Sequence, residues 1–144
     1  MSNAITGSHH SGMIRHNTSQ SVEMIIACHR AHRHKPLRSG ASHSTPVPVI
    51  AFSITAGAPK CFADIADSGN TLNPFFCDDC GSPIHGQRSK VHQMVVITVG
   101  IIDGINDLKL VMNISAKDAR PRIVTDPATG CHAANRRAVR SVSR

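Results

Sequence analysis

Short apolar runs separated by turn residues dominate the chain, and helical patterns are weak. Apolar residues at three- and four-residue spacing hardly persist beyond two turns, whereas runs rich in β-branched residues and bounded by Gly, Pro, Asp or Asn recur. The pattern predicts strands over six segments: 22–27, 49–55, 60–66, 72–77, 92–100 and 108–115. Several short strands joined by turns are typical of a mainly β domain.

The segment 28–48 departs from this pattern. It is rich in histidine and basic side chains and carries prolines at 36, 46 and 48. We predict an irregular loop there, long enough to be functional. Periodicity fades again after Arg120. The predicted organisation is therefore a flexible N-terminus (1–6), a single domain (7–125) and a basic, disordered C-terminal tail (126–144).

The composition leaves room for one aliphatic core. The chain has 144 residues, of which 40% are hydrophobic but only 3% are aromatic, with four Phe and no Trp or Tyr. That length suits a single domain. Its core must come mostly from Val, Ile, Leu, Met and Ala. Because large aromatic anchors are few, we expect modest stability unless a bound metal adds to it.

The net charge of +7 suits an anionic partner. The basic residues gather in the segments 28–38 and 135–144. No aromatic side chains alternate with them, so nucleic-acid bases would find little to stack on. This argues against nucleic-acid binding. Nucleic-acid association through the basic residues of the C-terminal tail stays open as an alternative function.

Cysteine usage and hydropathy indicate the compartment. Five cysteines, an odd number with one CxxC pair, argue against a secreted disulfide framework. The N-terminal residues lack the basic start and apolar run of a signal peptide. The longest apolar run, 94–102, is too short to span a bilayer. We expect a cytoplasmic protein with no membrane partner.

The stretch FFCDDCGSPIHG at 75–86 carries the clearest chemistry. Cys77 and Cys80 on a tight turn can point at one metal ion, and Gly81 lets the chain turn so that backbone amides face the sulfurs. This is half of a tetrahedral zinc knuckle. Inert cysteines and a redox pair are the alternatives. A redox pair is expected in a thioredoxin-like βαβ setting, and the negative charge of Asp78 and Asp79 should raise the thiol pKa values.

This motif and several others resemble the glutathione-dependent formaldehyde-activating enzyme family, also called the centromere protein V domain family. Its members look like Gly-x-Cys-His-Cys-Gly near the start, then Cys-His-Cys-x-x-Cys, then Phe-Cys-x-x-Cys-Gly-Ser-Pro, Gly-x-x-Asp and Arg-Pro-Trp. The corresponding stretches here, from about Gly7 to Arg122, are GSHHSG (7–12), CHRAHR (28–33), FSITAGAPKCF (52–62), FFCDDCGSP (75–83), VGIIDG (99–104) and ARPRI (119–123).

The resemblance implies an Mss4-like, β-tent fold with two zinc sites. One site is structural and is shared between the early Cys-x-Cys and the later CxxC. The other is catalytic and is held by Cys-His-Cys-x-x-Cys. The implied activity is that of a carbon–sulfur lyase or synthase, which joins formaldehyde to the glutathione thiol to give S-hydroxymethylglutathione. The implied partner is glutathione or another small anionic thiol.

The structural site keeps its second half, Cys77 and Cys80, and changes its first. The early family cysteines correspond to His9 and Ser11. Imidazole suits zinc as well as thiolate does, whereas serine is a poor ligand. We therefore predict that His9 joins the two cysteines around a structural Zn²⁺, with His10 or water as the fourth ligand. The alternative is that both histidines are exposed N-terminal residues.

The catalytic site has changed more. Cys28 keeps the first cysteine, but Arg30 and Arg33 stand at the second and third positions. Arginine stays protonated and cannot ligate zinc. Cys28 remains the catalytic candidate, and a Cys28/His32 pair that holds a second metal ion weakly stays open. The two guanidinium groups instead predict a binding site for an anion, such as the carboxylates of glutathione or a phosphate.

Positions where the family resemblance leads us to expect aromatic residues have also changed. Histidines stand where the family resemblance leads us to expect Tyr, at His16, His43 and His85, and Arg122 stands at the final Trp. We hypothesise a relaxed copy of the family whose fold outlives its chemistry. Two functions follow. The first is the zinc-dependent carbon–sulfur enzyme, impaired by lost ligands. The alternative is a non-catalytic, zinc-stabilised binding module with a basic anion-binding loop.

Overall fold

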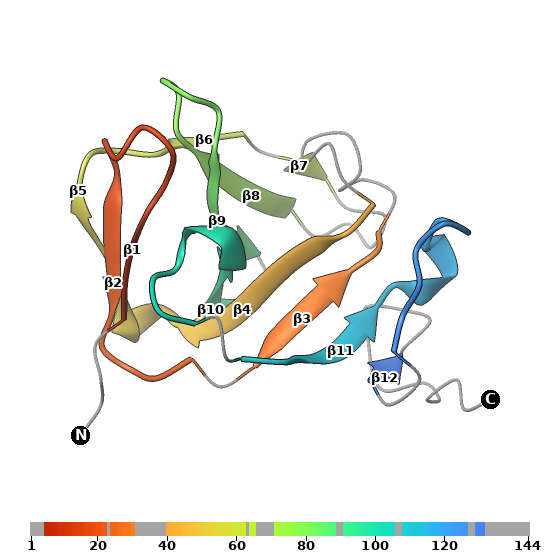
Figure 1. The fold of residues 1–144 in the computed structure, drawn as a ribbon. Coiled ribbons are helices and arrows are strands. Elements are labelled where there is room, and N and C mark those ends of the chain that lie inside the picture. The colour runs from red at the N-terminus through yellow and green to blue at the C-terminus, as the bar shows by residue number, and fades with distance from the viewer. Residues whose placement is uncertain are drawn as a thin grey trace. The chain divides into compact units, whose positions relative to one another are not determined.

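The chain folds into strands joined by turns and short 3-10 helices (Figure 1). The computed structural model describes residues 5–22, 24–30, 40–62, 64–65, 71–88, 91–105, 108–126 and 129–131. Two compact units divide the chain: unit 1 contains residues 1–23 and 45–107, and unit 2 contains residues 24–44 and 108–144. Within the described ranges, no helix is long and apolar enough to cross a membrane.

A three-stranded antiparallel sheet forms one part of unit 1. Its order is β1-β2-β5, with β1 at Ile5–Ser8, β2 at Arg15–Thr18 and β5 at Phe52–Ala56. Gly7 of β1 pairs with His16 of β2 and also bridges to Ile102. This pairing fixes where the chain leaves β1, and the candidate site begins at that point.

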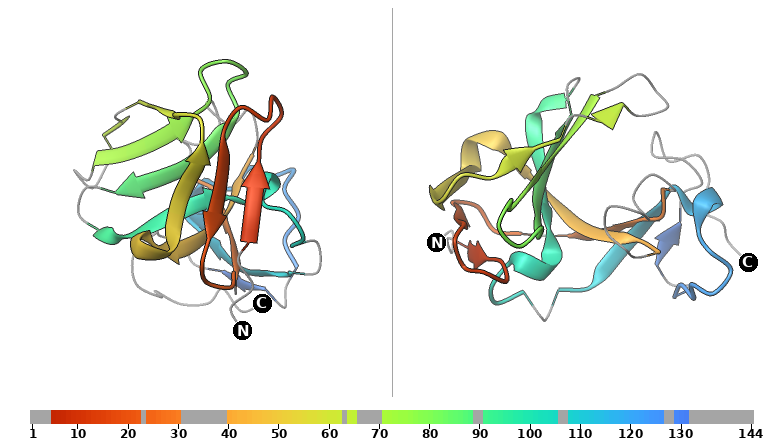
Figure 2. Two further views of the ribbon diagram at one scale, coloured as in Figure 1. Left: turned by 90° about the vertical axis from the view of Figure 1, so that its left-hand side faces the viewer. Right: turned by 90° about the horizontal axis from the view of Figure 1, so that it is seen from above.

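The other strands of unit 1 form an antiparallel ribbon around β8 and β9, which run side by side in Figure 2. Their order is β4-β10-β9-β8-β6, with β4 at Ser42–Pro48, and β7 also pairs with β8. The bounds are β6 Lys60–Cys61, β7 Asp64–Ile65, β8 Thr71–Phe76, β9 Pro83–Arg88 and β10 Val91–Thr98. Two 3-10 helices, η2 at Val49–Ala51 and η3 at Val99–Ile101, precede β5 and follow β10.

The core of unit 1 is aliphatic, as the composition predicts. Ile84 and Ile97 are completely buried, and Val47 and Val95 nearly so. On β10 the buried positions alternate with half-buried ones, which is the period-two pattern of a strand with one face in the core. Leucine and methionine contribute less than expected, because none of them is fully buried among the described residues.

A row of four rings crosses unit 1 and contains two histidines. His16 lies against Phe52 with ring centroids 5.7 Å apart, and His85 lies 4.8 Å from Phe52 and stacks on Phe75 at 4.4 Å. We call His16, Phe52, His85 and Phe75 the ring row. Burial lowers the pKa of His16. Burial, followed by repulsion from His16, lowers the pKa of His85 to about 4. His16 and His85, two of the three histidines at positions where the family resemblance leads us to expect Tyr, therefore pack as neutral rings.

Unit 2 is built on two parallel strands, β3 (Ile25–Cys28) and β11 (Leu110–Ile114). The start of β4 (Ser42–Pro48) pairs antiparallel with β3, and β12 (Gly130–Cys131) pairs parallel with β11. After β11 the chain turns at Ser115, whose φ of 51° is left-handed, into the 3-10 helix η4 (Ala116–Asp118).

The predicted strands are largely confirmed, with shifted ends. The segments 22–27, 72–77, 92–100 and 108–115 hold β3, β8, β10 and β11. The segment 49–55 begins as η2 and becomes β5, while 60–66 holds the two short strands β6 and β7. The fold class, mainly β and of Mss4-like type, is confirmed.

Part of the predicted loop 28–48 is wrong, because β4 occupies its end. Thr45 and Val47 are buried on alternate positions, while Pro46 lies between them and Pro48 follows Val47. Proline inside a run argues against a strand, and here it conceals the alternation. Residues 31–39 of that loop lie outside the described residues. The pattern also missed β1, β2, β9 and β12. β12 lies within the predicted tail 126–144. Most of that tail lies outside the described residues, so its boundary stays a prediction.

Candidate metal centre

The knuckle predicted at residues 77–82 is a closed turn between β8 and β9. The backbone N–H of Gly81 donates to the Cys77 carbonyl at 2.8 Å, and that of Cys77 donates to the Ser82 carbonyl at 2.9 Å. Gly81 has a φ of +77°, a conformation that glycine adopts without strain. The turn brings the sulfurs of Cys77 and Cys80 to one side.

A second turn, between β1 and β2, brings His9 and Ser11 to the knuckle. The N–H of Gly12 donates to the His9 carbonyl at 2.9 Å, and Gly12 has a φ of +71°. His9 is buried, while His10 and Ser11 are exposed. Both turns belong to unit 1, so the group that they form is internal to one compact body.

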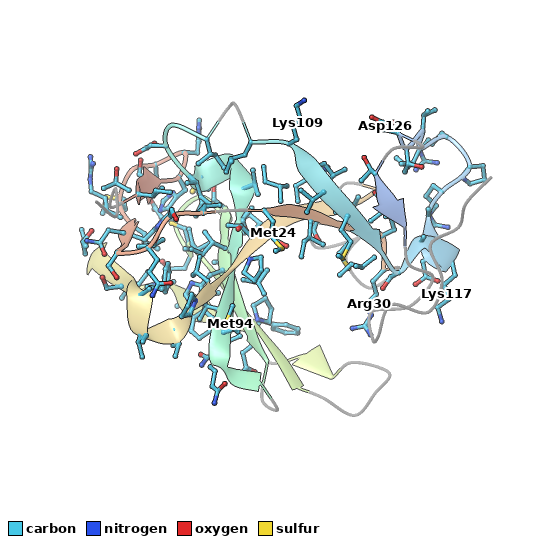
Figure 3. The ribbon with its side chains drawn as sticks, turned by 90° about the horizontal axis from the view of Figure 1, so that it is seen from below. Met24, Arg30, Met94, Lys109, Lys117 and Asp126 are labelled. Carbon is cyan, nitrogen blue, oxygen red and sulfur yellow. The ribbon has the colours of Figure 1, made fainter. Side chains whose placement is uncertain are left out.

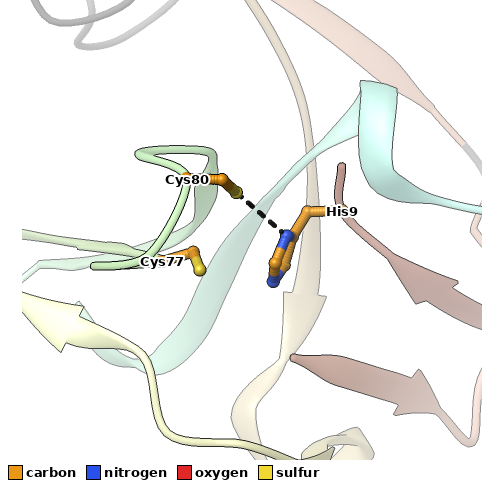
Figure 4. A group of neighbouring side chains, drawn as sticks. All are labelled: His9, Cys77 and Cys80. Atoms are coloured by element: carbon orange, nitrogen blue, oxygen red, sulfur yellow. Dashed lines mark hydrogen bonds between the residues drawn. The ribbon is translucent and has the colours of Figure 1, made fainter. Parts of the chain in front are cut away.

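His9, Cys77 and Cys80 converge. Their ligand atoms all lie within 4.8 Å of one another, and Figure 4 shows the two sulfurs and the imidazole directed at one point. His9 Nδ1 lies 3.3 Å from Cys80 Sγ. Cys77 is almost completely buried, whereas Cys80 is partly exposed. Two thiolates and an imidazole are a ligand set that zinc accepts.

The spacing of His9 Nδ1 and Cys80 Sγ fits a tetrahedral ion, and all three donor atoms lie within 4.8 Å of one another. Bond lengths of about 2.0–2.3 Å to nitrogen and sulfur place neighbouring ligand atoms about 3.3–3.8 Å apart. His9 Nδ1 and Cys80 Sγ, at 3.3 Å, have that separation. So does Ser11 Oγ, which lies 3.4 Å from His9 Nδ1 and 3.8 Å from Cys77 Sγ. The residues present therefore fit a zinc ion, with Ser11 beside the fourth position.

The imidazole of His9 is held by a backbone hydrogen bond. The N–H of Ile14 donates to His9 Nε2 at 3.1 Å. Because Nε2 accepts, the proton of the neutral ring lies on Nδ1, facing Cys80 Sγ. Ligation through Nδ1 would move this proton to Nε2 and break the Ile14 hydrogen bond, at a cost of about 1 kcal/mol. His9 is thus the weakest of the three donors.

Cys80 is an easily ionised thiol. Hydrogen bonds from the Ser82 hydroxyl and the Ser82 backbone, with smaller ones from Ser11, lower the pKa of Cys80 to about 6. The expectation that neighbouring carboxylates raise its pKa is wrong, because these hydrogen bonds dominate. Asp78 itself is paired with Lys60 at 3.4 Å. A thiol that ionises near neutral pH is a ready metal ligand, since metals bind thiolate.

The candidate catalytic residue, Cys28, lies elsewhere, at the end of β3 in unit 2. It is buried next to His29, whose Nε2 lies 2.8 Å from Asn113 Oδ1. Among the described residues, Cys28 belongs to no group of three metal-binding side chains. Arg30 follows β3 and is half-buried; its side chain is labelled in Figure 3. His32 and Arg33 lie outside the described residues, so their predicted roles stay predictions.

Two functional neighbours escaped the sequence analysis. Ser82 lowers the pKa of Cys80. The sequence indicated this role only by placing Ser82 directly after CxxCG. Asn113 is buried at a core position of β11 and contacts His29. A polar residue at a buried position of an apolar run, LVMNI, was the available signal.

Comparison with known proteins now defines the class. Residues 4–118 match the sequence profile described as "Glutathione-dependent formaldehyde-activating enzyme". The chain therefore belongs to that family, as its motifs indicated, and a glutathione-dependent, formaldehyde-activating type of function is supported at the level of the family. None of the curated proteins matches the chain.

A solved structure has the same fold. It is the crystal structure of a Rhodobacter sphaeroides protein determined as a structural genomics target. The two chains share 17% sequence identity with a TM-score of 0.54, over 70% of this chain and 90% of the other. At that identity the likeness concerns the fold alone.

Proposed function

We propose that this chain is a zinc-stabilised binding domain for glutathione or another small anionic thiol. The observation that carries the proposal is the convergence of His9, Cys77 and Cys80, whose ligand atoms lie within 4.8 Å of one another. The chain keeps a metal centre where the family resemblance expects a structural one. Where that resemblance expects the catalytic one, Cys28 keeps one cysteine and arginines stand at two of the ligand positions.

In this proposal the metal cross-links two segments of unit 1 that are far apart in the sequence. His9 and Cys80 are 71 positions apart, so a shared Zn²⁺ would act as a cross-link between the β1–β2 turn and the knuckle. Cys77 and His9 hold the buried side. Ser82 keeps Cys80 ready to ligate by donating a hydrogen bond to its sulfur. The free thiols Cys28, Cys61, Cys77 and Cys80 suit a reducing compartment, and we propose the cytoplasm.

The anionic part of the ligand is proposed to meet the basic segment after β3. Arg30 offers a guanidinium, which binds carboxylates through two parallel hydrogen bonds. Arg33 is expected to add a second. Glutathione carries two carboxylates and fits such a pair by charge.

The family match favours a second candidate, the carbon–sulfur reaction itself. In that reaction the S–H bond of glutathione and the π bond of the formaldehyde carbonyl break, the sulfur bonds to the carbon, and the proton passes to the oxygen, giving S-hydroxymethylglutathione. Cys28 would be the residue involved. Cys28 is buried beside His29, and arginines replace the two cysteine ligands expected near it. We therefore expect a weak activity.

Calorimetric titration of the zinc-loaded protein with glutathione tests the first candidate. We expect binding in the wild type and loss of about tenfold in affinity in Arg30→Gln, because one charge-assisted hydrogen bond contributes about 1.5–3 kcal/mol. Arg122→Gln, which removes an exposed arginine of the same unit, is the matched control and should bind normally. Absence of binding in the wild type would refute the proposal.

The second candidate is tested with the same protein. Formaldehyde and glutathione are mixed, and the rate of adduct formation is followed by NMR with and without enzyme. Acceleration that Cys28→Ala abolishes would establish the carbon–sulfur reaction. An unchanged rate would leave the binding function alone.

A further inference from the structure

We infer that the Asp103–Gly104 peptide is a self-modification site, at which the chain converts an aspartate into an isoaspartate without an enzyme. The two residues end the stretch VGIIDG, and the proposed function uses neither of them. No metal takes part, because the reaction needs only the backbone, one carboxyl group and water.

Asp103 and Gly104 form the tip of a turn that is anchored on both sides. Both residues are exposed, whereas the flanking Ile102 and Ile105 are buried. Gly104 has a φ of +72°, and nothing lies within 4 Å of the place that a Cβ would take. The tip therefore has room to change its shape while the residues on either side stay packed.

The amide nitrogen of Gly104 is available for reaction. Within the described residues, its N–H donates no hydrogen bond to a backbone carbonyl. Glycine also lacks the Cβ that crowds the backbone nitrogen of every other residue. Asp103 thus precedes the residue with which a five-membered imide closes most readily.

The conversion takes two steps, and its atoms balance. First the Gly104 nitrogen attacks the side-chain carboxyl carbon of Asp103. A C–N bond forms, the C–OH bond breaks, and the amide proton and the hydroxyl leave as water. Water then opens the imide. Opening at the former peptide carbonyl leaves the main chain running through the side-chain carboxyl carbon, which is isoaspartate. Nothing is oxidised or reduced, and the mass returns to its original value.

Thr6 restrains the carboxyl group. Its hydroxyl donates to Asp103 Oδ2 at 3.1 Å, and its backbone carbonyl accepts the N–H of Asp103 at 2.9 Å. The side-chain hydrogen bond is exposed, so water competes with it and the carboxyl group leaves Thr6 often. Loss of this hydroxyl should therefore speed the reaction.

Isoaspartate should loosen the attachment of this turn to β1. It adds one atom to the main chain directly after Ile102, which bridges to Gly7 of β1. The hydrogen bond from the Asp103 N–H to the Thr6 carbonyl lies beside that bridge. A backbone lengthened at this point displaces one or both pairings, so β1 should open more often.

Ageing of the purified full chain tests the site. The protein is kept in warm, neutral buffer and sampled over weeks, and its peptides are read by electron-transfer mass spectrometry, which distinguishes isoaspartate from aspartate. We expect isoaspartate to accumulate at Asp103 several-fold faster than at Asp78. The latter is also exposed but precedes an aspartate in place of a glycine, and it is the internal control.

Three variants sharpen the test. Asp103→Glu would need a larger ring and should give no product. Asp103→Asn closes the same imide with loss of ammonia, so it should react faster and gain the mass difference between an amide and an acid. Thr6→Val should react faster than the wild type.

Each part of the proposal has its own contradicting result. Equal amounts of isoaspartate at Asp103 and Asp78, or product only in the urea-unfolded chain, would overturn the site. A rate in Thr6→Val equal to that of the wild type would overturn the restraint by Thr6. Hydrogen exchange at Thr6 and Gly7 that is the same in fresh and aged protein would overturn the loosening of β1.

Discussion

Gly7 lies in β1, directly before the turn that carries the candidate metal ligand His9. It is buried in β1 opposite His16, just before the turn that carries His9. A Cβ at this position would overlap the Ile101 carbonyl oxygen and His16 Nε2. These two atoms lie 3.3 Å apart and hold η3 to β2. The absence of a side chain is therefore a structural requirement here.

Replacement of Gly7 by alanine should destabilise unit 1. We expect Gly7→Ala to lower the free energy of unfolding by about 1–3 kcal/mol, the usual effect of overpacking a tight site. Urea unfolding measures it. Gly100→Ala is the matched control, because nothing lies within 4 Å of a Cβ at that position. Equal stability of the two variants would contradict the packing described for β1.

Ser82 should control the ionisation of Cys80. In the metal-free protein we expect Ser82→Ala to raise the pKa of Cys80 from about 6 toward its ordinary value of 9, because the largest stabilising hydrogen bond is lost. The pH dependence of alkylation at Cys80, read by peptide mass spectrometry, measures the shift. Ser53→Ala, on β5, should leave the profile unchanged.

The candidate site was partly predictable from single residues. The sequence placed His9, Cys77 and Cys80 together because motif order, and not local pattern, identifies partners that are far apart in the chain. It could not give the Ile14 hydrogen bond that fixes the His9 tautomer, since this depends on how the β1–β2 turn closes. It also misjudged Cys80, because hydrogen bonds at 3.2 Å outweigh the exposed carboxylates near it.

The ring row acts at the scale of elements, since its members lie on β2, β5, β8 and β9. The Nδ1 atoms of His16 and His85 are buried without a hydrogen-bond partner. A neutral imidazole tolerates this environment better than a charged one, because protonation would place two neighbouring positive charges in the core. Burial consequently lowers both pKa values.

Unit 1 should lose stability in mild acid. Unfolded His85 takes up a proton below its ordinary pKa of 6.5, whereas the folded ring resists protonation until about 4. The stability is therefore complete above pH 6.5 and falls as the pH drops from 6.5 to 4, by at most about 3.5 kcal/mol at 1.4 kcal/mol per pKa unit. Urea midpoints across this range measure the loss.

A phenylalanine in place of His85 isolates this effect. His85→Phe keeps a ring between Phe52 and Phe75 but cannot be protonated, so the acid-induced loss should shrink. His43→Gln removes an exposed imidazole from β4 and should leave the loss unchanged. A pH dependence as large in His85→Phe as in the wild type would show that His85 does not cause it.

At the element scale, the apolar strands were predictable and the polar ones were not. β10 and β11 contain runs of apolar, β-branched residues, and such runs predict strands. β2 (RHNT) and β9 (PIHGQR) are polar, and they are strands because their partners align them: His16 pairs with Ile54, and His85 with Phe75 and Ile97. Tertiary pairing overrides local propensity in such segments.

At the scale of the whole molecule, the chain keeps the fold of its family. The aliphatic core and the knuckle carry the architecture, and neutral histidines pack against two of the few phenylalanines. Metal at His9, Cys77 and Cys80 would supply the stability that a core poor in aromatic residues lacks. Chelation should accordingly lower the melting temperature of the wild type and have no effect on Cys77→Ser/Cys80→Ser.

Zinc content per chain, measured by elemental mass spectrometry on the purified protein, tests the central claim most directly. We predict about one zinc per chain, the content of one tetrahedral site. The double variant Cys77→Ser/Cys80→Ser should contain none. A wild type without zinc, or a zinc ion that persists in the double variant, would contradict the metal centre at the knuckle.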